Sequence, residues 1–146
     1  MRQRRSLDFQ SLGEVLPDVE RLLEGHETVG RWTLGQILEH LSTAIRLSLL
    51  PPGDPSAGRG SEALRKRFFE RRRFPEGAEA PHPRLIPNAD AEPRQAAADL
   101  RDAIGRWDST TGPFPEHPLL GTLTKDEWHQ FHCIHCAHHL SFAIPA

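Results

Sequence analysis

The chain has 146 residues, of which 37% are hydrophobic and 26% are charged, and its formal net charge is −2. This length and composition predict one soluble globular domain over residues 1–146, and the balanced charge excludes a strong general attraction to nucleic acid or to a membrane surface. We expect a cytoplasmic protein without a membrane-spanning helix, signal peptide or disulfide scaffold, because no apolar run reaches about 18 residues and the chain has only two cysteines.

Two helices are predicted in the first third of the chain, each opened by a capping box, in which a hydroxyl residue is followed three positions later by Glu or Gln. The first box covers residues 11–14, and apolar residues then recur at helical spacing as far as Gly25. Pro17 lies close to this start, so we expect either a later start or a local kink. The second box covers residues 33–36, and the proline pair at Pro51 is predicted to end that helix.

The middle of the chain is predicted to contain two long loops with a short helix between them. Residues 53–60 are rich in Pro, Gly and Ser, and residues 75–91 contain many prolines, so both segments are predicted as loops. The helix between them, over residues 61–74, is strongly basic. We interpret its charges as a solvated surface, with an anion or nucleic-acid site as the alternative. Pro93 suits the first turn of a further helix, which runs to Asp108.

A third capping box, at residues 124–127, predicts a last helix that runs to about Phe142. No segment alternates between apolar and polar residues as a half-buried strand does, so no strand is expected. Four main helices with two long connections predict an all-α fold, a four-helix bundle with long crossover connections.

Five of the nine histidines lie between His129 and His139, on this last helix. Successive helical side chains are about 100° apart, so residues four apart differ by roughly 40°. His135 and His139 therefore share one face of the helix, which is expected to be buried. The large apolar residues on that face are Trp128, Phe131 and Phe142. His132 and His138 lie about 60° to either side of it.

Two buried imidazoles need partners for their ring nitrogens, because an unpaired buried polar group costs roughly 1–3 kcal/mol. One metal ion supplies a partner for both, since the i, i+4 spacing of His135 and His139 lets them reach the same ion. Neutral imidazole suits zinc, nickel, copper or iron. The alternative is that these histidines bond to carbonyls or to acids on other helices. We favour the metal because the pair belongs to a cluster of five.

A metal site needs at least a third ligand from elsewhere in the chain. His40 is the candidate inside a predicted helix, one turn after Gln36, where it flanks the apolar stripe. The other histidines, His26, His82 and His117, lie beside Gly or Pro in segments where solvent exposure is expected. Three histidine ligands would leave coordination positions open, as catalytic sites do.

Cys133 and Cys136 form a Cys-x-x-Cys pair in the middle of the last helix. Redox pairs of this kind lie at the start of a helix, where the helix dipole lowers the thiol pKa. We therefore interpret these cysteines as small packing residues, with a thiolate metal site as the alternative.

Four passages of the chain resemble the DinB/YfiT-like superfamily of metal-binding four-helix bundles and, within it, an uncharacterised branch. The passages are RRSLDFQSLGEVLPDVERLL, RWTLGQILEHLS, GPFPEHPLLGTLTKDEW and HQFHCIHCAHHLSF. The resemblance implies three metal ligands: His40, which stands before a leucine, together with His135 and His139. It leaves His132 and His138 as alternative ligands or as groups around the ligands.

The same resemblance implies a divalent ion, nickel or zinc, a homodimer, and crossover connections between the helices. It also implies a reaction, because relatives use the metal to deprotonate a low-molecular-weight thiol, which then attacks a small-molecule substrate. Gln36, one turn before His40, is placed to orient a bound water or thiol.

Three functions remain as hypotheses. The chain is a metal-dependent enzyme, either a thiol-dependent S-transferase or a hydrolase; or it is a non-enzymatic metal-binding or stress-related bundle; or it is a structural bundle without a metal. The first two differ in whether the ion keeps a position open to a substrate. No catalytic residue beyond the ligands is predicted.

Overall fold

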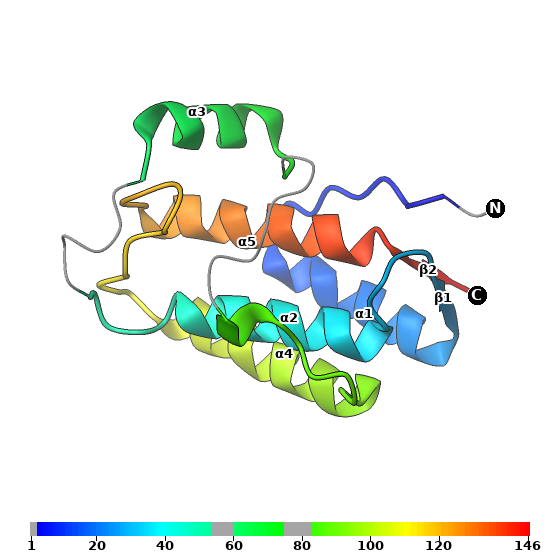
Figure 1. The fold of residues 1–146 in the computed structure, drawn as a ribbon. Coiled ribbons are helices and arrows are strands. Elements are labelled where there is room, and N and C mark those ends of the chain that lie inside the picture. Colours follow the sequence, from blue (N-terminus) through cyan, green and yellow to red (C-terminus); the bar gives the residue numbers. More distant parts are fainter. Residues whose placement is uncertain (1–2, 54–59, 75–82) are drawn as a thin grey trace.

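The computed structural model describes residues 3–53, 60–74 and 83–146, and it confirms a predominantly α fold (Figure 1). Its α-helices are α1 (Val15–Glu24), α2 (Leu34–Leu47), α3 (Glu62–Arg71), α4 (Pro93–Ser109) and α5 (Lys125–Leu140). The other elements are the 3-10 helices η1 (Leu12–Glu14) and η2 (Pro83–Leu85) and the strands β1 (His26–Thr28) and β2 (Ala143–Pro145). Much of the two predicted loops, residues 54–59 and 75–82 with His82, lies outside the described residues.

The first capping box opens a 3-10 turn before the first α-helix. Glu14, the last residue of η1, accepts a hydrogen bond from the Ser11 N–H at 2.7 Å, and the α-helix starts only at Val15. Pro17 therefore lies in the first turn of α1, where its missing N–H removes no intrahelical bond. The later start, one of the two alternatives expected for Pro17, is confirmed.

The capping boxes of α2 and α5 are complete. In α2 the Thr33 hydroxyl accepts from the Gln36 N–H at 3.2 Å, and Gln36 Oε1 accepts from the Thr33 N–H at 2.9 Å. Thr124 and Glu127 make the same exchange at the start of α5. α2 ends at Leu47, about a turn before the proline pair that is predicted to end it.

The prediction that the chain has no strand is wrong. β1 and β2 form a small antiparallel sheet in which His26 pairs with Pro145 and Thr28 pairs with Ala143. Each strand has three residues, which is too short for an alternating pattern to be detected. The sheet ties the segment after α5 to the segment after α1 (Figure 1).

The core lies among α1, α2, α4 and α5. α2 packs along α4 and also contacts α5, while α1 contacts α4 (Figure 1). The approach of α2 to the start of α4 is close, since a Cβ on Gly35 would lie 2.0 Å from the Ala91 carbonyl oxygen. The most deeply buried large side chains are Trp107, Leu12, Leu22, Leu34, Ile37, Leu38, Leu41, Ile45, Leu100, Leu140, His132 and Val15.

α3 lies on the outer side of α5 (Figure 1). Phe68 of α3 and Phe74, which follows α3, both contact the Phe131 ring, with centroid distances of 5.6 and 5.7 Å. Within the basic segment, residues 61–74, the exposed basic side chains are Lys66, Arg67, Arg71 and Arg73. The basic segment therefore covers α5 with its aromatic residues and presents part of its charge to solvent. Among the described residues, no helix has the length and apolar character needed to cross a membrane.

Candidate metal centre

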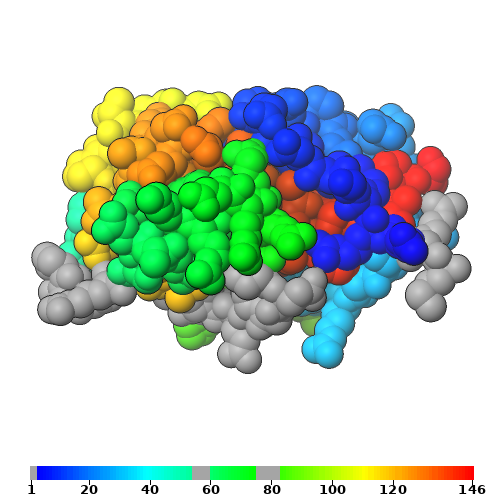
Figure 2. Space-filling view, turned by 90° about the horizontal axis from the view of Figure 1, so that it is seen from above, coloured from blue at the N-terminus to red at the C-terminus, as the bar shows by residue number. Residues whose placement is uncertain are grey.

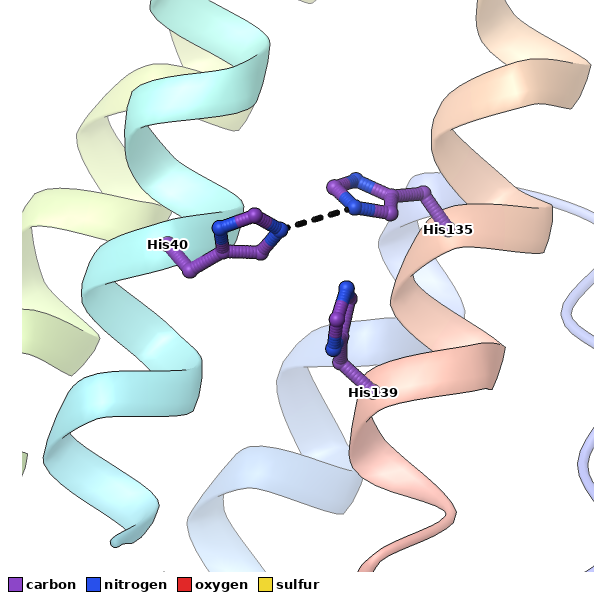
Figure 3. A group of neighbouring side chains, drawn as sticks. All are labelled: His40, His135 and His139. Carbon is purple, nitrogen blue, oxygen red and sulfur yellow. Dashed lines mark hydrogen bonds between the residues drawn. The ribbon is translucent and has the colours of Figure 1, made fainter. Parts of the chain in front are cut away.

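Three histidines from two helices converge where α2 contacts α5 (Figure 3). His40 comes from α2, and His135 and His139 come from α5; one ring nitrogen of each lies within 4.8 Å of the others. His40 Nε2 and His135 Nε2 are 2.9 Å apart. His40 and His135 are buried, and His139 is half-buried. The structure thus brings together the three histidines that were candidates for metal ligands.

The i, i+4 spacing on α5 produces the second half of this cluster. Residues four apart lie one above the other on a helix, and the ring centroids of His135 and His139 are 4.7 Å apart. His40 faces both rings from α2, with centroid distances of 4.8 Å to His135 and 4.4 Å to His139. Helical geometry and the packing of α2 on α5 therefore bring the three rings together.

A backbone carbonyl fixes the orientation of His40. Its Nδ1 lies 2.7 Å from the carbonyl oxygen of Leu85, in η2. Because a carbonyl oxygen only accepts hydrogen bonds, Nδ1 carries the hydrogen and Nε2 keeps its lone pair. That lone pair is on the side of His135 and His139 (Figure 3). Metal-binding histidines commonly make such a bond through their second ring nitrogen.

All three imidazoles are held in the neutral form. Burial lowers the pKa of His40, and the bond to Leu85 offsets part of this effect. Burial, followed by the neighbouring histidines, lowers the pKa of His135 well below its usual range. Burial also lowers the pKa of His139 to about 2, with smaller contributions from neighbouring histidines and Arg4. Neutral imidazole is the form that binds a metal ion.

The separation of the His40 and His135 ring nitrogens fits a divalent ion. Bonds of about 2.0–2.1 Å from one ion to two imidazole nitrogens place those nitrogens roughly 2.9–3.4 Å apart. The separation of 2.9 Å between His40 and His135 lies at the short end of this range. The limit of 4.8 Å for the whole set is wider, so binding of one ion by all three rings would require the His139 nitrogen to come closer to the other two. The donor set consists of three imidazoles.

Two aromatic rings cover the histidines, and no sequence pattern points to either of them. Trp32 stacks on His139 with 5.4 Å between ring centroids, and its ring also lies 4.8 Å from His40. The Phe74 ring lies 5.1 Å from that of His135. Trp32 precedes α2 and Phe74 follows α3, so only the tertiary fold brings them to the same site.

The residues predicted to surround the ligands lie in three different environments. The side chain of Gln36 caps α2 through its Oε1. His138 lies beside the cluster, with its ring 4.8 Å from that of His139. His132 lies in the core, where its Nε2 is 2.8 Å from the Ser48 hydroxyl oxygen. Burial, followed by two neighbouring histidines, lowers the pKa of His132 to about 3.

His117 corrects a prediction, because this loop histidine, expected to be exposed, is buried. Its Nδ1 accepts hydrogen bonds from the N–H groups of Leu119 and Leu120 at 3.0 and 3.1 Å. Its ring packs on Phe131 at a centroid distance of 4.5 Å, and burial lowers its pKa to about 4. The turn that contains His117 thus folds the ring back against α5. His26 is exposed, as predicted.

Both cysteines are buried in the core with free thiols. Burial raises the pKa of Cys133 to about 12, and burial also raises the pKa of Cys136. Neither sulfur belongs to the cluster of candidate ligands. Because the thiolate is the form that binds metals, these protonated thiols support the interpretation as packing residues.

One family model matches the whole chain, residues 1–146, and its description is "Protein of unknown function (DUF1569)". No solved structure matches the chain significantly. The matched range contains the three clustered histidines and the rings that cover them.

Proposed function

The chain belongs to the DUF1569 family, proteins of unknown function, and we propose that it is a metal-dependent enzyme whose ion is held by His40, His135 and His139. The ion is nickel or zinc, two of the metals that neutral imidazole suits and the two that the resemblance to the DinB/YfiT-like superfamily implies. The substrate is a small molecule, and the reaction is either S-transfer from a low-molecular-weight thiol or hydrolysis.

The observation that carries this proposal is the bond between His40 Nδ1 and the Leu85 carbonyl oxygen. It commits Nδ1 as a donor and leaves the Nε2 lone pair facing His135 Nε2 at 2.9 Å. Without a metal, one N–H of His135 can donate to His40 Nε2, and this hydrogen bond does not involve His139. One ion would accept a lone pair from each of the three rings, so metal binding accounts for all three histidines of the cluster.

The ligand set favours an enzyme over a metal store. Three protein ligands leave at least one coordination position open, and the half-buried His139 gives the site a less enclosed side. A divalent ion with an open position lowers the pKa of a bound thiol or water and so supplies a nucleophile at neutral pH. The rings of Trp32 and Phe74 pack on the ligands and would limit the access of bulk water.

We also propose that α1, α2, α4 and α5 form a four-helix bundle of the DinB-like type. These helices supply most of the buried core, whereas α3 lies outside α5 (Figure 1). The resemblance of the sequence to that superfamily implies one ligand on the second bundle helix and two on the last. The candidate ligands have this distribution, with His40 on α2 and the other two on α5.

A metal-binding protein without catalysis is the second candidate function. The observation that favours it is the position of His138, whose ring lies 4.8 Å from that of His139. A fourth histidine ligand would close the coordination shell and leave no position for a substrate.

Cobalt(II) substitution tests the ligand assignment and the open position together. The wild type, His135→Ala, His139→Ala and the control His129→Ala would be loaded with cobalt and freed of excess metal. His129 lies on the same helix, but its Nε2 accepts from the Leu12 N–H at 3.3 Å instead of facing α2. We expect one equivalent of cobalt in the wild type and the control, and loss of cobalt from the two ligand variants. Addition of 2-mercaptoethanol should then produce a thiolate-to-cobalt absorption band.

The outcomes separate the candidates. Equal cobalt retention in all four proteins would contradict the ligand assignment. Stoichiometric cobalt that depends on the two ligand histidines, but whose spectrum does not respond to thiol or to other small ligands, would favour the closed, non-catalytic site.

A further inference from the structure

We propose that Arg4 binds a carboxylate group on the small molecule that reaches the histidine centre. This inference rests on the proposed function and adds the charge class of the ligand. The hydrogen bonds of the Arg4 guanidinium and its position next to His138 support this inference.

The Arg4 side chain is held at the C-terminal end of α5 by contacts that leave part of its fork unused. Nε donates to the Ser141 hydroxyl oxygen at 3.0 Å. Nη2 lies 3.3 Å from His138 Nδ1 and 3.4 Å from the His138 carbonyl oxygen. The guanidinium lies over the Phe142 ring, 4.0 Å from its centroid. Nη1 has no hydrogen-bond partner within the described residues, so an oriented pair of N–H donors remains.

Arg4 lacks the acidic partner that the next arginine in the chain has. Arg5 donates from both Nη atoms to the two carboxylate oxygens of Asp18, each at 2.8 Å. In the part of the chain that the structure describes, no carboxylate forms an ion pair with Arg4. Its charge is therefore not compensated by a described acid, and a guanidinium in this state binds an anionic oxygen group well.

The same arginine lies beside the candidate ligands. The His138 ring, which Arg4 contacts, is 4.8 Å from the His139 ring. His139 is the half-buried member of the cluster, and it is the member next to the His138 ring that Arg4 contacts. Figure 2 shows the N-terminal segment, in dark blue, lying against the C-terminal residues in red. The chain thus places a positive charge beside His138, the neighbour of His139.

A carboxylate matches this group best. Because Nε and Nη2 are already engaged, the N–H groups of Nη1 are the ones that would donate charge-assisted hydrogen bonds to a carboxylate oxygen. The chain as a whole is slightly negative, so attraction of an anion to this point would come from the local charge. The expected ligand carries its reactive group at one end and a carboxylate at the other.

The test compares three thiols that differ in terminal charge, using the cobalt(II)-loaded protein. They are 3-mercaptopropionate, 3-mercapto-1-propanol and 3-aminopropane-1-thiol. The thiolate-to-cobalt band gives a Kd for each thiol in the wild type, Arg4→Gln and Arg67→Gln. Arg67 is an exposed cation on α3, so its variant makes the same change of net charge outside this network. Because the thiols differ in acidity, the readout is the change in their Kd ratios between proteins.

We expect Arg4→Gln to weaken binding of the anionic thiol about tenfold, the effect of one charge-assisted contact, and to leave the neutral thiol unchanged. Arg67→Gln should keep the wild-type ratios. An unchanged Kd for the neutral thiol shows that the cobalt site is intact in the variant. If Arg4→Gln does not retain cobalt, Arg4→Lys replaces it; this variant keeps the charge without the fork and should show a smaller loss.

Two results would overturn the inference in different ways. If Arg4→Gln keeps the wild-type Kd ratios, Arg4 does not bind the ligand, although the open metal site remains. Arg4→Lys gives the same test if Arg4→Gln retains no cobalt. Bound cobalt whose spectrum responds neither to the three thiols nor to other small ligands would contradict the open site of the proposed function, and the inference with it.

Discussion

His40 is fixed by a main-chain group, and this has a consequence for mutagenesis. The acceptor is the carbonyl oxygen of Leu85, so no change of the side chain at position 85 removes it directly. The Leu85 side chain is itself buried, and η2 contacts α2. The orientation of one candidate ligand therefore depends on a segment 45 residues away in the sequence, through its backbone.

Replacing both cysteines with serine should leave the metal content unchanged and lower the stability. Cys133 and Cys136 are buried, and each serine would bury a hydroxyl in an apolar environment, at a cost of about 1–3 kcal/mol when unpaired. Elemental analysis and thermal denaturation measure the two effects. The corresponding double alanine variant controls for the loss of packing. Loss of the metal from both folded variants would make the thiols ligands and contradict the three-histidine assignment.

The contact between α2 and the start of α4 depends on Gly35. Gly35→Ala would place a Cβ 2.0 Å from the Ala91 carbonyl oxygen, so the two segments must move apart. We expect destabilisation of about 1–3 kcal/mol or more, as for other overpacked sites. Because His40 lies on the same helix, weaker metal binding should accompany it.

Gly105→Ala is the matched control for this contact. Gly105 lies on the exposed side of α4, and a Cβ there meets nothing within 4 Å. Alanine is the better helix former, so this change should stabilise the protein by up to about 1 kcal/mol. Urea denaturation compares the two variants, and destabilisation of equal size in both would contradict the close contact at Gly35.

The helices were predictable because their signals are local. Each capping box and each proline at a helix start acts within a few residues, and the structure places helix starts at or near these signals. The paired strands could not be predicted, because each has three residues and they pair across most of the chain. The position of α3 on α5 could not be predicted either, because it depends on contacts between aromatic rings that are remote in sequence.

The same distinction applies to the candidate centre. Helical phase alone places His135 and His139 on one face, because the i, i+4 relation is a property of the helix. The prediction that this pair shares its site with His40 was supported by the resemblance to a family, because helical phase places His40 only at the flank of the apolar stripe of its helix. Trp32 and the buried His117 depend on how distant segments pack, and their local sequence carries no signal of it.

Buried neutral histidines make the stability of the whole molecule depend on pH. The pKa of His132 is lowered to about 3 and that of His117 to about 4, whereas the unfolded chain has values near 6.5. From about pH 6.5 down to pH 4, the unfolded chain therefore binds protons that the folded chain does not. The free energy of unfolding should therefore decrease as the pH is lowered, by up to about 1.4 kcal/mol per pH unit for each of these two histidines.

Denaturant titrations of the metal-free protein at several pH values measure this dependence. His132→Phe should reduce the slope, because it removes one of the buried neutral histidines, which also include the three clustered ones, while keeping an aromatic ring in the core. His26→Ala should keep the slope, since His26 is exposed. A free energy of unfolding that stays constant across this pH range would show that neither His132 nor His117 is held neutral by the fold.

Metal content, measured in the untagged wild type and in His40→Ala, tests the cross-helix centre most directly. Both proteins would be incubated with zinc and with nickel, freed of excess metal, and examined by elemental analysis and circular dichroism. We predict one equivalent of metal in the wild type and its loss from a folded His40→Ala variant, because α5 alone supplies only two of the three ligands. Absence of metal from the wild type, or equal content in both proteins, would contradict the centre.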